Sequence, residues 1–334
     1  MIQSEEVRQR LRNELPPGIF EPVPQRVWYA ALNLATFAVA LWLVKGASST
    51  WLKVAFGAVA GHSVACLGAF AHDLTHGSVL RAGRLNHALQ LVCWGLNMIA
   101  PAVWFRVHNR THHSTAGTLG DPDRRFSLQQ QSVERRLYSD LFYPSRDAGF
   151  FNPLCLLHFI PYISKHTLNA LGVHTSLLPA PVPFSAPERR RVATELVVLL
   201  TGHACLWAWL GTLENILAGG ILPVAVSSAV LMMYIFTQHF PLPLAETPDV
   251  LATTVSLRLP RLVDALHSNL SYHVEHHLFP RLSSKHFPIV SEWLTANCPQ
   301  AYRRLGLIEA WQMVFTGARW TGSAPTAPAP VSEG

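Results

Sequence analysis

Long runs of apolar residues alternate with polar connections along the chain, and this pattern predicts four membrane-spanning helices. The runs cover residues 27–44, 54–71, 192–210 and 216–236. Each is close to the length of about 20 residues that a helix needs to cross the hydrocarbon core of a bilayer. We therefore expect an all-α integral membrane protein whose remaining residues form a helical cap outside the bilayer.

Two further apolar segments contain too many polar residues and prolines for regular spans. Residues 85–104 include three amide side chains and Pro101, and residues 150–163 include Pro153 and Pro161. Irregular backbone at membrane depth must be buried in protein or reach water. Both segments are therefore expected to be re-entrant or interfacial.

The distribution of positive charge predicts the orientation. Only 14% of the 334 residues are charged, and the formal net charge is +6. Arginine triplets precede the first and third runs at Arg8, Arg10, Arg12, Arg189, Arg190 and Arg191. The positive-inside rule then places both termini and all long connections in the cytoplasm. Because the membrane accounts for the positive charge, we expect no nucleic-acid binding.

Composition also divides the chain into segments. Residues 1–26 are polar and lack a signal peptide, so they are predicted to form a cytosolic N-terminal segment. Residues 27–320 form the predicted membrane domain, and residues 321–334, rich in Ala, Pro and Ser, are expected to be a disordered tail. The five cysteines form no CxxC pair, which favours buried thiols over disulfides.

Three short clusters contain eight histidines at the spacing of metal ligands. They comprise His72 and His76, then His108, His112 and His113, then His273, His276 and His277. Residues i and i+4 share a helix face, so the first pair can face one metal. The other two clusters repeat that pairing and add an adjacent histidine, so each is able to reach two metals. Imidazole is a good ligand for iron, zinc and copper.

The predicted spans bring these clusters to one face. The first cluster directly follows the second apolar run, and His239 follows the fourth run at the same depth. The second cluster follows residues 85–104, and the third lies beyond the last span. All of them fall on the predicted cytoplasmic side, as a shared metal centre requires.

The clusters resemble the three histidine boxes of the membrane fatty acid desaturase superfamily, which includes hydroxylases and carotenoid ketolases. Their order and spacing match the pattern HxxxH, HxxxHH and HxxHH from about residue 27 to residue 280. The resemblance implies two iron ions, O2 as co-substrate and His239 as a ninth ligand. It also implies a lipid or fatty-acyl substrate and a separate electron donor of the ferredoxin, rubredoxin or cytochrome b5 type with its reductase.

Several neighbours of the boxes are candidates for supporting roles. Asp73 and Glu275 are expected to accept the second ring N–H of ligand histidines. Asp121 and Asp123 either do the same or form a turn around Pro122. Asn269 either holds a metal-bound water or serves as a helix cap or surface amide.

Several residues outside the clusters also have expected roles, and most of them have two alternatives. His62 and His203 lie within predicted spans, where they form interhelical hydrogen bonds or line a tunnel. Glu195 is expected to reach the membrane interface. Trp104 and Phe105 either wall a substrate channel or anchor the interface. Arginines near the second cluster either dock an acidic electron carrier or reflect positive-inside bias; they are Arg124, Arg125, Arg135 and Arg136.

These observations favour an O2-dependent di-iron fatty-acyl desaturase. Hydroxylation, carotenoid ketolation and oxidative decarboxylation of a fatty acid to a terminal alkene use the same oxidant and stay open. Removing hydrogen from an unactivated C–H bond is beyond side-chain acids and bases, so a metal must supply the oxidant. A metal transporter is a distant alternative, because it needs ionisable groups along the membrane midplane whereas the clusters lie at one edge.

Overall fold

The computed structural model describes residues 4–16, 18–123, 133–144, 152–173 and 182–316, with 133–136 and 316 described by backbone alone. The predicted tail at 321–334 lies outside these residues, as do Arg124 and Arg125 and the side chains of Arg135 and Arg136.

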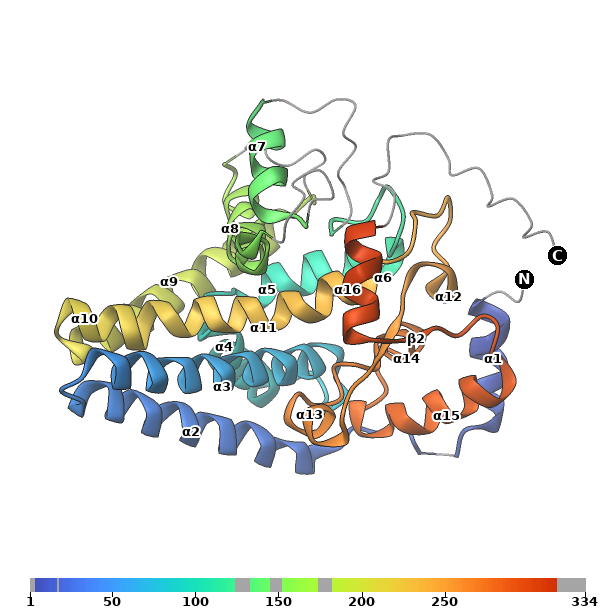
Figure 1. Cartoon of the computed structure of the whole chain (residues 1–334), viewed down its shortest axis with the longest axis horizontal. Helices are drawn as coiled ribbons and strands as arrows, with labels where there is room; N and C mark the ends of the chain where they lie inside the picture. Colours follow the sequence, from blue (N-terminus) through green and yellow to red (C-terminus); the bar gives the residue numbers. More distant parts are fainter. Residues whose placement is uncertain (1–3, 17, 124–132, 145–151, 174–181, 317–334) are drawn as a thin grey trace.

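Four helices are long and apolar enough to cross a membrane, and they contain the four predicted runs (Figure 1). The first is η1 with α2 and the fourth is α10, η5 and α11 in continuous succession. Their bounds are Pro24–Gly46, Thr50–His76 (α3), Ala186–Leu210 (α9) and Leu213–His239. Each extends a few residues beyond the apolar run, because polar residues continue the helix past its hydrophobic stretch.

The remaining elements are shorter. Before the third span lie α1 (Ser4–Glu14), α4 (Arg84–Gly95), α5 (Pro101–Trp104), η2 (Phe105–His112), α6 (His113–Thr115), α7 (Val133–Phe142), η4 (Pro153–Leu157) and α8 (Phe159–Ala170). After the fourth lie α12 (Val250–Thr253), β1 (Ser256–Arg258), α13 (Arg261–Leu266), α14 (His273–Leu278), η6 (Ser284–His286), α15 (Phe287–Asn297), β2 (Arg304–Gly306) and α16 (Leu307–Thr316). Within the fourth span, α10 is Leu213–Ile216, η5 is Leu217–Ile221 and α11 is Leu222–His239, while η1 is Pro24–Arg26 and α2 is Val27–Gly46. The segments predicted to be re-entrant or interfacial form α4 with α5, and η4 with the start of α8.

Helix α3 lies at the centre of the bundle and packs against α2, α4 and α11. Its contact with the fourth span is close because Gly57 and Gly61 face that span. A Cβ on Gly57 would lie 2.1 Å from the carbonyl oxygen of Ala218, and one on Gly61 would lie 2.6 Å from Cβ of Val226. Small residues four apart allow this approach between helices in a membrane.

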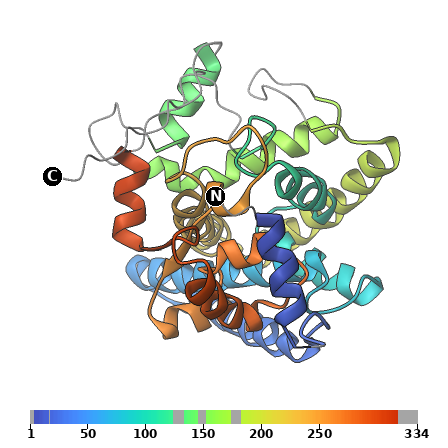
Figure 2. The ribbon, with the colours of Figure 1, turned by 90° about the vertical axis from the view of Figure 1, so that its right-hand side faces the viewer.

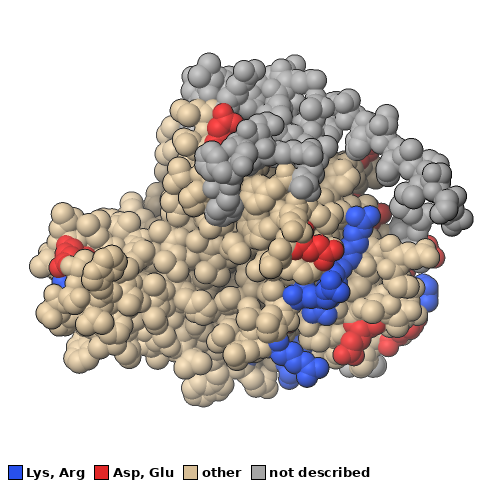
Figure 3. Space-filling view, viewed as in Figure 1, with Lys and Arg blue, Asp and Glu red and all other residues tan. Residues whose placement is uncertain are grey.

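The outer faces of the spans carry the exposed apolar residues expected for contact with lipid. Trp28, Trp42 and Trp51 are exposed near helix ends, where tryptophan anchors spans at the membrane interface. In the view of Figure 3, the bundle half of the surface is almost free of charge except near its far end, whereas Lys and Arg gather over the opposite half. The charge distribution therefore follows the predicted division between membrane and cap.

The cap lies at one end of the bundle, where α1, α14 and α15 come together (Figures 1 and 2). Leu11 of α1 packs in one buried cluster with Val274 and Leu278 of α14 and Leu294 of α15. Within the described residues, the departure from an all-α fold is the parallel pair β1–β2, in which Ser256 is opposite Arg304 and Arg258 is opposite Gly306. The strands are only three residues each, too short to appear as a period in the sequence.

Candidate metal centre

Two membrane helices bring histidines to the end of the bundle that faces the cap. His72 and His76 lie in the last turns of α3, and His239 is the last residue of α11. Gly77 ends α3 immediately after His76 with φ 76°, a left-handed conformation that glycine adopts without steric cost. The helix therefore stops where its histidines reach the cap.

The second cluster lies on a π-helix, and this changes which of its histidines share a face. Residues 105–112 form the π-helix η2, in which backbone bonds join residues five apart. The N–H of His113 bonds the carbonyl of His108, and the ring Nε2 atoms of these residues lie 3.1 Å apart. The spacing had suggested His108 with His112. Instead His108 and His113 face one group of ligands, and His112 faces another.

The third cluster occupies the short helix α14, which side chains of the cap hold in place. The hydroxyl of Ser256 accepts hydrogen bonds from the N–H groups of His273 and Val274, each at 3.0 Å. That hydroxyl in turn donates to the carboxylate of Glu275 at 2.5 Å, and Tyr302 donates to the same carboxylate. Hydrogen bonds within the protein therefore hold the N-terminus of α14 in place without a contribution from a metal.

The nine histidines predicted from the sequence gather into two adjacent groups. In the five-histidine group, one ring nitrogen of each residue lies within 4.8 Å of the others; its members are His72, His76, His108, His113 and His276. The four-histidine group contains His112, His239 and His277 at the same separation, joined by His273. Nε2 of His273 is 2.7 Å from Nε2 of His239 and 3.2 Å from Nε2 of His277. Ligands from three chain segments therefore converge on each of two points.

Burial keeps most of these rings neutral. It lowers the pKa of His108, His113 and His276 well below the ordinary value, and the neighbouring imidazoles lower it further. The same two causes act on the pKa of His273 and His277. A neutral imidazole offers a lone pair to a metal, so the environment prepares the rings as ligands.

His112 is the exception, because two carboxylates face its other nitrogen. Nδ1 of His112 lies 2.9 Å from Oδ1 of Asp121 and 3.3 Å from Oδ2 of Asp123. Burial opposes the charge, but these carboxylates raise the pKa of His112 to about 9. Asp121 also accepts the N–H groups of Gly117 and Asp123, at 2.8 and 2.9 Å. Asp121 and Asp123 therefore both form the turn around Pro122 and contact His112, so the two roles that the sequence left as alternatives occur together.

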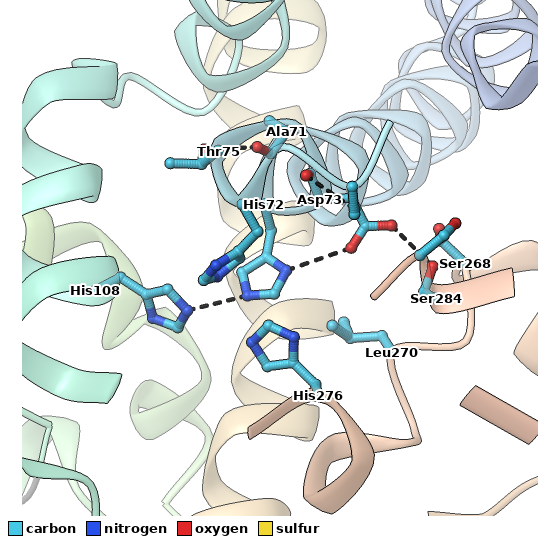
Figure 4. A network of polar contacts seen from close by, with 12 residues as sticks. Ala71, His72, Asp73, Thr75, His108, Ser268, Leu270, His276 and Ser284 are labelled. Carbon is cyan, nitrogen blue, oxygen red and sulfur yellow. Dashed lines mark hydrogen bonds and ion pairs between the residues drawn. The ribbon is translucent and has the colours of Figure 1, made fainter. Parts of the chain in front are cut away.

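Asp73 forms a second carboxylate contact, to the five-histidine group (Figure 4). Its Oδ1 lies 3.6 Å from Nδ1 of His72, and its Oδ2 contacts Arg26 at 2.5 Å and accepts the hydroxyl of Ser284 at 2.8 Å. Nε2 of His72 is 3.0 Å from Nε2 of His108. The carboxylate thus links α3 to the start of α2 and to the cap.

Two predicted supporting residues lie differently from the expectation. The Glu275 carboxylate accepts hydrogen bonds from Ser256 and Tyr302, so this side chain anchors α14. Asn269 does not precede His273 on the same helix. It lies in a turn with φ 59°, a conformation that asparagine tolerates, and its amide donates to the carbonyl of Ser284 at 2.8 Å. It still lines a small pocket with His72, His273 and His276.

An apolar cavity ends on both histidine groups. Its volume is about 790 Å³ including its opening, and its walls are mainly apolar and aromatic. Trp104 lines it and stacks on His108, with ring centroids 4.5 Å apart and planes inclined by 19°. Phe105 is exposed instead. Trp104 therefore forms part of the cavity wall, and Phe105 does not.

The cavity also contains polar side chains that no sequence motif had pointed to. His158 and Tyr162 line it, and the Tyr162 hydroxyl donates to Asp123. Nδ1 of His158 lies 3.2 Å from the hydroxyl of Tyr138. No spacing relates α8 to the histidine clusters, so only the fold brings these residues to the site.

The chemistry of the donor set fits two metal ions. Six Nε2 to Nε2 separations between histidines fall between 2.7 and 3.3 Å, so many ring nitrogens aim at shared points. A closed zinc site needs four ligands. Nine imidazoles in two groups are therefore enough for two ions, and neutral nitrogen donors suit iron among other metals.

Four helices able to span a membrane, two histidine groups and an apolar cavity between the spans and the cap are features of membrane metalloenzymes with hydrophobic substrates. The chain belongs to the fatty acid desaturase family, whose model matches residues 49–307. It is an oxidoreductase of that family.

Three relatives illustrate the similarity. The chain is 22% identical to the sn-1 acyl-lipid omega-3 desaturase (ferredoxin) of Synechocystis, over 82% of this chain and 76% of the relative. It is 24% identical to the human sphingolipid delta(4)-desaturase/C4-monooxygenase, over 89% and 81%. It is 26% identical to a probable fatty acid desaturase of Sorghum bicolor, over 83% and 72%.

Proposed function

We propose that this protein is an O2-dependent di-iron desaturase that introduces a double bond into a fatty-acyl chain of a lipid. The observation that carries this proposal is the apolar cavity that ends on both histidine groups. Such a cavity suits a long hydrocarbon far better than a polar metabolite. The relatives' names support an acyl-lipid or sphingolipid substrate class.

The nine histidines would hold the two irons, which supply the oxidation of an unactivated C–H bond by O2. Overall, two C–H bonds break and one C=C bond forms. O2 takes two electrons from the substrate and two from a donor, and leaves as two waters after uptake of two protons. The cavity wall holds the acyl chain against the histidine groups, and Trp104 fixes the position of His108.

Carboxylates of this chain orient the ligands. Asp121 and Asp123 keep a proton on Nδ1 of His112, which leaves Nε2 as the donor atom. Asp73 has the same relation to His72 at a longer distance. Asn269 is assigned to a water beside the five-histidine group, because its side chain lines the pocket next to His72 and His276.

Hydroxylation is the second candidate outcome. The human relative's name pairs a desaturase with a C4-monooxygenase, so one scaffold of this family is described with both reactions. The two outcomes differ in whether a second C–H bond breaks or oxygen enters the substrate.

The proposal includes an orientation and an electron source. The arginines beside the first and third spans support a cytoplasmic metal site with both termini on the same side. Residues 27–320 then act as one membrane domain. Electrons come from a separate carrier with its reductase, and the ferredoxin in the cyanobacterial relative's name supports that class.

Product profiling tests the proposal. Lipids from cells that express the protein are compared by mass spectrometry with those from cells that express His276→Ala. His286→Ala is the matched control, since His286 lies on η6 outside both histidine groups. We expect new internal double bonds with the wild type and the control only, and two irons per chain in the purified protein. Zinc without iron in an active preparation, or hydroxylated products alone, would overturn the desaturase assignment.

A further inference from the structure

A third cluster of metal-ligand side chains lies away from the nine histidines. His62 and Cys66 are one turn apart on α3, and His267 follows α13 more than 200 residues later. One ligand atom from each lies within 4.8 Å of the others. The cluster shares no residue with the two histidine groups. His62 precedes His72 by ten residues, which is roughly 15 Å along a helix.

The geometry resembles that of the two histidine groups. Nε2 of His62 lies 3.0 Å from Nε2 of His267, and Sγ of Cys66 lies 3.9 Å from Nδ1 of His62. Zinc binds imidazole nitrogen at about 2.0–2.1 Å and thiolate at about 2.3 Å, so ligand atoms around one tetrahedral ion lie roughly 3.3–3.6 Å apart. The two Nε2 atoms differ from this separation by a few tenths of an ångström, whereas Sγ of Cys66 is 3.9 Å from the other nitrogen of His62, Nδ1. A rotation of the Cys66 side chain would therefore accompany metal binding.

A tyrosine orients the ligand that comes from the cap. The hydroxyl of Tyr234 lies 2.6 Å from Nδ1 of His267, so the opposite nitrogen, Nε2, is aimed at His62. Metal-binding histidines characteristically use their second nitrogen in this way. Cys66 is buried, whereas His62 and His267 are half-buried, so an ion would reach the cluster from the side of His267, which belongs to the cap.

We propose that His62, Cys66 and His267 form a third metal site, which binds a zinc-type ion with a fourth position open to water. Two imidazoles and a thiolate form a borderline-to-soft donor set, which favours zinc over hard cations such as magnesium. His62 and Cys66 lie at positions i and i+4 of α3 and meet one distant histidine. His72 and His76 of the same helix meet His108 of η2 in the same way.

The site would fix the turn that leads into the third histidine cluster. The carbonyl of Leu266 accepts hydrogen bonds from Tyr29 at 2.5 Å and from the Cys66 thiol at 3.3 Å, and α13 lies beside the start of α2 (Figure 1). Metal binding would release the thiol proton to solvent and replace the second hydrogen bond by the metal–thiolate bond. Leu270 lines the main cavity, as does Tyr234. An ion at this site would therefore cross-link α3 to the segment that forms part of the cavity wall.

Cobalt(II) is a suitable probe because a cobalt–thiolate bond gives a near-ultraviolet charge-transfer band that histidine ligands do not give. The iron-loaded protein in detergent is titrated with Co²⁺. We expect the band to saturate near one equivalent and to be absent in Cys66→Ser. Cys205→Ser is the control, since Cys205 is an exposed thiol on another span. Tyr234→Phe should weaken Co²⁺ binding by about tenfold.

The iron content of each variant shows whether it folds, and His267→Ala tests the site without altering α3. Loss of the band in that variant, with iron retained, supports the site. Absence of the band in the wild type, or its persistence in Cys66→Ser, would show that the cluster only forms hydrogen bonds. Because the readout is Co²⁺ binding, the result does not depend on the reaction that the enzyme catalyses.

Discussion

Nε2 of His108 and Nε2 of His113 lie 3.1 Å apart although the residues are five positions apart in the chain. The π-helix η2 makes them neighbours on one face and turns His112 toward the four-histidine group. Adjacent histidines in the sequence therefore belong to different groups.

Replacing these two histidines separately should remove iron from different groups. We expect His113→Ala and His112→Ala each to retain roughly half of the wild-type iron, because each variant leaves one ligand group complete. The double variant should retain almost none. Metal analysis of purified protein measures this, with Ser114→Ala as the control. Complete loss of iron in either single variant would contradict independent occupancy.

The carboxylate of Asp121 should set the strength of the four-histidine group. Asp121→Asn keeps the shape of the side chain but removes the charge that faces Nδ1 of His112. Loss of such a partner typically weakens metal binding by about 10–100-fold. Competition with a chelator measures the change. Asp140→Asn alters an exposed carboxylate and should have no effect.

Filling the cavity should shorten the chains that the enzyme accepts. Leu231 is buried and lines the cavity, so Leu231→Trp should reduce turnover of long acyl chains more than that of short ones. Iron content should remain at the wild-type level. Val197→Trp, on an exposed face of α9, is the matched control. Equal loss of activity for all chain lengths would indicate a general disturbance of the fold.

Acid should destabilise the metal-free protein. Burial lowers the pKa of His108, His113, His273, His276 and His277 well below 6.5, so below that pH the unfolded state binds more protons than the folded state. Their contribution is complete above pH 6.5 and is lost as the pH falls through their folded pKa values. His112, with a pKa raised to about 9, acts in the opposite sense and in another pH range: its contribution is complete below pH 6.5 and is lost as the pH rises through about 9.

Thermal unfolding of the chelator-treated protein between pH 8 and pH 5 measures this dependence. We expect the midpoint to fall steadily below about pH 6.5. Between pH 8 and 6.5 the raised pKa of His112 predicts a rise of the midpoint on acidification. A midpoint that fails to fall below pH 6.5 would contradict the lowered pKa values of the other five histidines.

The close contact between α3 and the fourth span should not tolerate a larger residue at position 61. In Gly61→Leu the new side chain would enter the backbone of Pro223 and the side chain of Val226. Overpacking commonly costs about 1–3 kcal/mol, and backbone contacts are the least able to relax. Thermal unfolding in detergent should show a large fall in the midpoint. Gly202→Leu is the control, because a Cβ there meets nothing within 4 Å.

The sequence predicted the membrane helices and the nine histidines that meet because both are local patterns. Apolar length defines the spans and box spacing identifies eight of the histidines, while His239 was added from its place after the fourth apolar run and from the family resemblance. The pairing of His108 with His113 was not predictable, because spacing arguments assume an α-helix. No sequence pattern in residues 105–112 indicates a π-helix.

Long-range contacts account for the other differences. Glu195 was expected at the membrane interface, but it is buried and accepts the N–H of Ala102 at 2.7 Å, at the start of α5. His203 does form an interhelical hydrogen bond, to the carbonyl of Gly95 at 2.9 Å. The cluster of Cys66 with His267 joins residues about 200 positions apart, a separation at which no motif gives a signal.

The pairing of β1 with β2 sets where the functional unit ends. Strand β1 begins with Ser256, which holds the start of α14, and Tyr302 just before β2 donates to Glu275 of the same helix. The last histidine of the three clusters is His277. A chain cut soon after it would lose strand β2 and the Tyr302 hydroxyl, which keep α14 in place. Truncations and C-terminal fusions should therefore be made beyond Thr316, since an earlier boundary would disturb the metal ligands from outside the motif that contains them.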